Sequence, residues 1–215
     1  MRRSRAIFWA AFAVCLASAG ASSAASALEF YVEHKLIQGL LNIDSVLHSA
    51  QSILKAEISG AQVEITCPEL HNTGWIHNGL SPSKVLLGLG LIEVHFLKCT
   101  VPVPASEHCS IANGGLILTS TLVDLGTIGG ETYALFSPDH STTFVEITFE
   151  GCKQTALNAT FSIKGEAVAL MSNPGLLIFK EGAPNNKLKF AGNSATLIAE
   201  DLVLMEGTGA LIEAL

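Results

Sequence analysis

Two glutamates, Glu64 and Glu146, are the sharpest catalytic candidates in the sequence, because each stands second in a Val-Glu-Ile-Thr tetrad. If the two tetrads form neighbouring strands, the carboxyl groups approach each other, and paired carboxylates are the acid and base of glycoside hydrolysis. Glu146 and Glu150 share one strand face, but at about 13 Å they are farther apart than glycosidase pairs, which lie at about 5 to 10 Å. Glutamate is ordinarily exposed, so we interpret these residues as solvent-facing and assign no catalytic residue.

A second catalytic candidate is Asp139-His140-Ser141, which contains the residue types of a hydrolase triad. A triad brings its members together from separate elements, whereas three neighbours that follow Pro138 are typical of a turn. The chain contains no nucleophile elbow, zinc-protease helix motif, phosphate loop or dinucleotide fingerprint. The sequence therefore favours a protein without catalytic residues, although it leaves the question of an enzyme open.

Metal binding is the third chemistry to consider, because Cys67, His71 and His77 lie close together in the sequence. Their spacing, Cys-x3-His-x5-His, is not a zinc-binding spacing. Segment 68–78 is rich in turn-forming residues, so we predict a loop with solvated histidines. We expect neither a metal site nor a cofactor.

The first 27 residues have the pattern of a secretory signal peptide. Three arginines within the first five residues precede an apolar segment at 6–16 and a tail of small residues that ends at Ala27. The apolar segment is too short to span a bilayer, which takes about 20 residues. We predict cleavage before Leu28, which leaves residues 28–215 as a single β domain that is secreted, periplasmic or on the cell surface.

The charge of this mature chain argues against nucleic acid as a partner. The whole chain has 12 Lys and Arg against 19 Asp and Glu, and every arginine lies in the predicted signal peptide. Without it the net charge is about −10, whereas nucleic-acid binding depends on clusters of Lys and Arg. The longest apolar run downstream, 85–92, is too short for a transmembrane segment.

Four cysteines remain in the mature chain, Cys67, Cys99, Cys109 and Cys152, and an even number in an exported protein favours two disulfides. We rank first the pairing Cys99–Cys109, which would clamp the proline-containing loop 100–108. Cys67 would then pair with Cys152, and this is plausible if the tetrads that precede these two cysteines form neighbouring strands. The alternative, Cys67–Cys99 with Cys109–Cys152, stays open.

The elements that must position these residues are short strands. Two-residue alternation of apolar and polar residues occurs at 92–97, 145–150 and 161–164, which is typical of an antiparallel sheet with one wet face. Further strands are predicted at 116–122, 132–136, 175–180, 187–191 and 196–204. About ten or more short strands indicate an all-β fold, an antiparallel β-sandwich or barrel.

Segment 45–55 is the exception to this pattern. It places five apolar residues on one helical face, with Ser45 as a possible N-cap. The alternation of Leu54, Ala56 and Ile58 favours a strand instead. A short helix is therefore an open alternative for the first half of this segment, and we predict a strand for the second.

The placed cysteines and strand residues together carry a family resemblance. In order, they are Phe30-Tyr31-Val32-Glu33, Val63 to Cys67, Phe96-Leu97-Lys98-Cys99, Cys109, Thr119 to Leu122, Phe144 and Gly151-Cys152. This order resembles a group of uncharacterised exported bacterial β-proteins, up to about Gly165. The resemblance implies an exported β domain and no particular activity.

The sequence thus predicts a non-enzymatic structural, adhesive or binding domain that contacts an unknown cell-envelope or extracellular partner of a bacterium. One alternative is a secreted hydrolase whose carboxylates converge only in the fold. Another is a lipocalin-like carrier, which requires a closed barrel with an open apolar interior.

Overall fold

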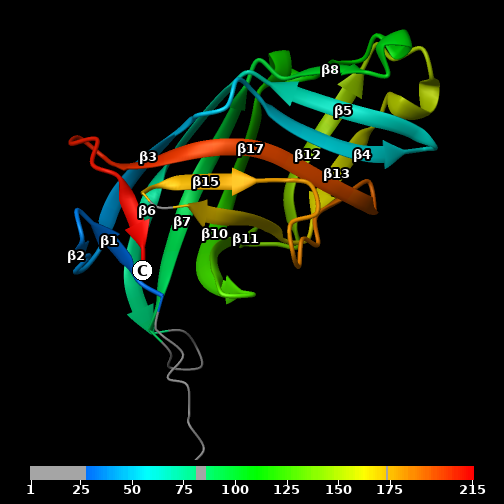
Figure 1. The fold of residues 1–215 in the computed structure, drawn as a ribbon. Coiled ribbons are helices and arrows are strands. Elements are labelled where there is room, and N and C mark those ends of the chain that lie inside the picture. The colour runs from blue at the N-terminus through cyan, green and yellow to red at the C-terminus, as the bar shows by residue number, and fades with distance from the viewer. Residues whose placement is uncertain (1–27, 81–85, 173) are drawn as a thin grey trace, which may run out of the picture.

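A computed structural model describes residues 28–80, 86–172 and 174–215, and the predicted signal peptide lies outside these residues. The fold is all-β, and eight antiparallel strands form a closed barrel (Figure 1). The barrel strands are β3 (Leu41–Leu47), β6 (Glu69–Leu80), β7 (Leu86–Leu97), β10 (Ile117–Ile128), β11 (Glu131–Pro138), β14 (Ala167–Ser172), β15 (Leu176–Phe179) and β17 (Asn193–Met205). The last strand closes the ring, because Leu202 of β17 is paired with Val46 on one side and with Leu176 on the other.

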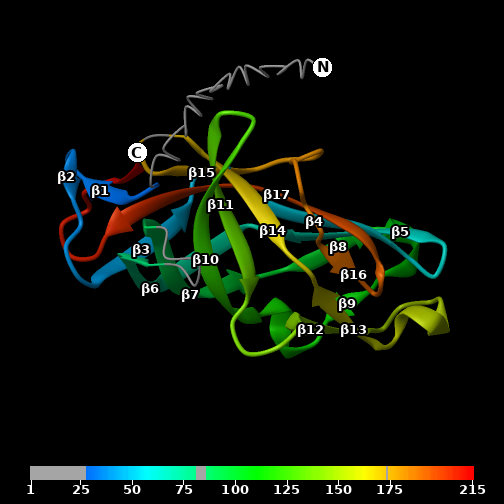
Figure 2. The ribbon, with the colours of Figure 1, turned by 90° about the horizontal axis from the view of Figure 1, so that it is seen from below.

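A second sheet extends from one end of the barrel, and β17 belongs to both (Figures 1 and 2). Its strands, in spatial order, are β9 (Ser110–Ile111), β12 (Thr143–Glu150), β13 (Thr160–Lys164), β16 (Lys189–Phe190), β17, β4 (Ser52–Ile58), β5 (Ala61–Cys67) and β8 (Thr100–Val103). Three single turns of 3-10 helix lie in its connections, η1 (Ala105–Glu107), η2 (Asn113–Gly115) and η3 (Thr155–Leu157). No helix in the described part of the chain has the length and apolar character to cross a membrane.

A small sheet of β1 (Phe30–Val32), β2 (Lys35–Leu36) and β18 (Ile212–Ala214) covers the other end of the barrel. The Asn78 side chain of β6 holds it there: its Oδ1 accepts from the Phe30 amide at 2.7 Å and its Nδ2 donates to the Phe30 carbonyl at 3.0 Å. Phe30 and Ile212 are buried and share with Ile76 the lining of a void of only about 20 Å³. This end of the barrel is therefore packed.

Two disulfides join Cys67 to Cys99 and Cys109 to Cys152. The pairing ranked first from the sequence is wrong, and the alternative is found. Cys99 and Cys109 do not close a short clamp, because the chain between them runs out along β5 as strand β8. Cys67 and Cys152 do not lie on neighbouring strands, since β5 pairs with β4 and β8 whereas β12 pairs with β13 and β9.

Two further local expectations, one alternative and one prediction, differ from the structure. The first half of 45–55 is not a helix but the end of β3 and a tight turn, whereas the strand predicted for its second half is confirmed as β4. Segment 68–78 is not a loop, because most of it lies in the long barrel strand β6. Glycine at position 74 allows β6 to approach β7 closely, since a Cβ at this position would lie 2.2 Å from the carbonyl oxygen of Leu91 on β7.

The other predicted strands are confirmed, with shifted ends. They are β7 (predicted at 92–97), β10 (116–122), β11 (132–136), β12 (145–150), β13 (161–164), β15 (175–180), β16 (187–191) and β17 (196–204). The predicted choice between a sandwich and a barrel is settled as an eight-stranded barrel with additional strands.

Candidate functional site

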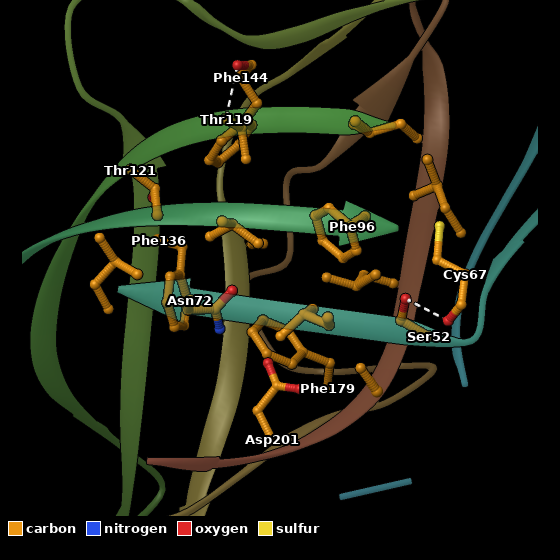
Figure 3. A pocket seen from close by; sticks show the side chains of 18 of the residues that line it. Ser52, Cys67, Asn72, Phe96, Thr119, Thr121, Phe136, Phe144, Phe179 and Asp201 are labelled. Carbon is orange, nitrogen blue, oxygen red and sulfur yellow. Dashed lines mark hydrogen bonds between the residues drawn. The ribbon is translucent and has the colours of Figure 1, made fainter. Parts of the chain in front are cut away.

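An apolar cavity of about 110 Å³ lies where the barrel meets the second sheet. Because alternate residues of a strand point to the same face, the longer strands contribute side chains at a spacing of two, as β7 does with Ile92, Val94 and Phe96. Its walls are mainly aliphatic and aromatic, and Figure 3 shows Phe96, Phe136 and Phe179 among them. One water molecule needs about 10–15 Å³ of cavity volume. A cavity of about 110 Å³ is several times larger and has room for a small organic molecule.

An unfilled cavity of this size lowers the stability of a protein. At about 24 cal/mol per Å³ the cost is roughly 2 to 3 kcal/mol, which is a considerable part of the 5 to 15 kcal/mol that typically separates folded from unfolded states. An apolar cavity with few polar partners holds water poorly and takes up apolar molecules instead. The interior therefore has the physical properties of a binding site for an apolar molecule.

Three buried polar side chains, Ser45, Asn72 and Asp201, interrupt this apolar lining; we call them the polar cluster. They come from adjacent barrel strands, β3, β6 and β17, and Ser45 is paired directly with Asn72 in the register. The Asn72 amide donates a hydrogen bond to the Ser45 hydroxyl. Figure 3 shows Asn72 and Asp201 among the side chains that line the cavity.

Two acceptors of the polar cluster have no hydrogen-bond partner, Oδ1 of Asn72 and Oδ1 of Asp201. Both residues are almost fully buried, with 8% and 3% of their surface exposed. Burial raises the pKa of Asp201 to about 7, although a side-chain hydrogen bond with Asn72 offsets part of the rise. Asp201 is the only ionisable side chain among the described residues that line the cavity.

The raised pKa of Asp201 makes a testable prediction about stability. Because the folded chain holds this proton more tightly than the unfolded chain, whose Asp pKa is about 3.9, the contribution of Asp201 is most favourable below about pH 4 and is lost as the pH rises to about 7. The expected loss is on the order of 4 kcal/mol, at about 1.4 kcal/mol per pKa unit. Asp201→Asn should abolish this dependence, as measured by urea unfolding across that pH range.

Asp44→Asn is the matched control, since Asp44 precedes Ser45 on β3 and is half-buried on the outer face. This variant should keep the pH dependence of the wild-type chain. Parallel stability profiles for the wild-type and Asp201→Asn chains would contradict the role given to burial.

The catalytic candidates from the sequence do not line the cavity. Glu64 lies 3.7 Å from Lys55, its cross-strand partner, and Glu146 is exposed on β12, so the structure does not bring the two glutamates onto neighbouring strands. Asp139 and His140 contact each other at 2.8 Å, with His140 exposed and Asp139 largely buried. Among the described residues, no group of three or more His, Cys, Asp or Glu side chains could hold a metal ion.

Sequence reasoning missed the polar cluster. Asn72 lies in the segment that was predicted to be a loop, and Ser45 was interpreted as a helix cap. Asp201 did carry a signal: on β17 it shares the inward phase of the strand with Ala199 and Val203, both buried apolar residues. An acid in the apolar phase of a strand indicates a polar site in a core.

The fold and the cavity can also be compared with known proteins. No family model matches the chain, and neither the curated proteins nor the solved structures contain a match.

Proposed function

We propose that this chain is an exported, non-enzymatic binding protein that holds an apolar ligand inside its barrel. The observation that carries the proposal is the apolar cavity between the interior of a closed barrel and the second sheet. Of the functions considered from the sequence, the lipocalin-like carrier is the one that requires such an interior.

The chemistry of the cavity walls supports binding over hydrolysis. General acid and base catalysis of glycoside cleavage takes two carboxyl groups that face one substrate. The described lining contains a single carboxyl group, that of Asp201, and Glu64 and Glu146 are held on strands that do not pair. A buried, apolar volume with one polar cluster is the usual form of a small-molecule binding site.

The two disulfides support export, because disulfides persist in oxidising compartments and are rare in the cytosol. With the charged start and apolar segment of residues 1–27, they favour a location outside the cytoplasm. We further propose that residues 1–27 are the cleaved signal peptide, that residues 28–215 are one domain and that the host is a bacterium.

The test is saturable binding of small apolar molecules to the purified mature chain. Hexane and toluene should each bind at one site and raise the midpoint of thermal unfolding. A ligand at about ten times its Kd stabilises by about 1.4 kcal/mol, which for a chain of this size is roughly 3 to 6 °C. Calorimetry should show a negative heat-capacity change, the mark of apolar burial. If neither molecule stabilises the fold, the proposed function is wrong.

A further inference from the structure

The polar groups that line the cavity are not equivalent, because some are already satisfied and others are not. The hydroxyl of Thr119 donates to the Phe144 carbonyl at 2.7 Å, and that of Thr121 to the Ser137 carbonyl at 2.8 Å. The Ser52 hydroxyl donates to the Cys67 carbonyl at 3.3 Å. These three side chains are therefore occupied by the backbone of the protein itself.

What remains is a pair of acceptors, Asn72 Oδ1 and Asp201 Oδ1, both buried and both without a partner. A buried acceptor that has no donor costs on the order of 1–3 kcal/mol, and more if it is charged. The cost disappears when a bound molecule supplies donors at that place. The cavity therefore favours a ligand that is apolar over most of its length and carries hydrogen-bond donors at one end.

We propose that the ligand is an aliphatic amine, bound with its chain in the apolar cavity and its ammonium group at Asn72 Oδ1 and Asp201 Oδ1. This inference rests on the proposed function, since it names the class of molecule that the same cavity holds.

An ammonium group suits this site better than the other common head groups. It has three donors, so it can serve both acceptors at once, whereas a hydroxyl has one donor and can serve only one of them. Its positive charge also compensates a buried carboxylate, which is costly when unpaired. A carboxylate head, as in a fatty acid, offers only acceptors and would face Asp201 with a like charge.

The experiment compares four probes that share one chain length: hexylamine, hexanol, hexanoate and hexane. Their affinities for the full mature chain are measured by titration calorimetry near pH 8. Hexylamine should bind about tenfold or more tightly than hexane, a difference of about 1.4 kcal/mol, and hexanoate should bind more weakly than hexane.

Asp201→Asn removes the charge with almost no change in size, so it should remove most of the advantage of hexylamine and leave hexane binding within about twofold, since transfer of the hexyl chain depends on apolar area. Retained hexane binding shows that the variant is folded. Asp44→Asn, with its carboxamide on the outer face of β3, should bind all four probes as the wild-type chain does.

The outcomes separate the two proposals. If hexane binds but hexylamine has no advantage, or its advantage survives in Asp201→Asn, the amine site is overturned and the apolar carrier stands. If hexanol equals hexylamine in the wild-type chain, the head group is not an amine and the inference is again overturned. If none of the four probes binds, both the inference and the proposed function fall.

Discussion

Replacing Ala199 with phenylalanine is expected to weaken the binding of hexane and toluene strongly without unfolding the protein. Ala199 lies on β17, is 2% exposed and lines the cavity. A phenyl ring is the size of benzene, which an apolar cavity of about 150 Å³ takes up, so a ring attached at Ala199 should fill most of the space. Affinity for either molecule should fall by about tenfold or more, or about 1.4 kcal/mol.

Stability gives this variant a second readout. Filling an empty cavity recovers part of the roughly 2 to 3 kcal/mol that the cavity costs, whereas a phenylalanine forced into a packed core costs about 1–3 kcal/mol. Urea unfolding of Ala199→Phe should therefore show a stability equal to or above that of the wild-type chain. A strongly destabilised variant would mean that the cavity is smaller than described.

Ile198→Phe is the matched control for Ala199→Phe. Ile198 is the preceding residue of β17, does not line the cavity, and is half-buried on the other face of the strand. Because side chains alternate between faces, the same new residue placed here should leave hexane and toluene binding intact. If both variants lose binding equally, the loss comes from distortion of β17 and not from a filled cavity.

The parts of the fold that could be predicted from sequence are those where a strand has one solvent-exposed face and one buried face. In β12, Ile147 and Phe149 are buried while Glu146 and Glu150 are exposed, and this alternation is plain in the sequence. β6 lacked such a signal. Its Gly74 is suited to a close approach of β7, and its Asn78 binds the backbone of β1, so residues that usually mark turns serve tertiary contacts here.

The false helix at 45–55 has a related cause. Apolar residues from the end of β3 and the start of β4 are separated by a tight turn, and together they imitate the spacing of one helical face. Only the partners of these strands resolve the ambiguity, since Val46 pairs with Leu202 and Ile53 with Ile198 of the distant β17.

The cavity could not be predicted because it depends on which strands become neighbours. Ser45, Asn72 and Asp201 are far apart in the sequence, and they meet because β3 lies between β6 and β17. The disulfide ranking was wrong for the same reason, because the order of the strands in the sheets is not visible in the sequence. A local loop clamp and a match between two similar tetrads both looked reasonable in the absence of the sheet.

Loss of either disulfide is expected to destabilise the chain, by on the order of 4 kcal/mol each in the loop-entropy description. The bridges close loops of similar length, with sequence separations of 32 and 43. For a chain of this size that corresponds to roughly 8 to 16 °C in the midpoint of thermal unfolding. The double variants Cys67→Ala/Cys99→Ala and Cys109→Ala/Cys152→Ala should therefore have similar, strongly lowered midpoints.

Ligand binding should separate the two bridges, because only one of them touches the cavity. Cys67 lines it at the end of β5, and Cys99 is held against Gly115, whose carbonyl accepts from the Cys99 amide at 2.9 Å. Without this bridge the Cys67 end of β5 loses its covalent link to Cys99 and is held only by its pairing with β4 and β8, so this part of the cavity wall should loosen and hexane affinity should fall at a temperature where the variant is still folded. Cys109 and Cys152 do not line the cavity, so their variant should bind hexane as the wild-type chain does. The opposite ranking would show that the cavity is held by the β9–β12 side of the second sheet and not by β5.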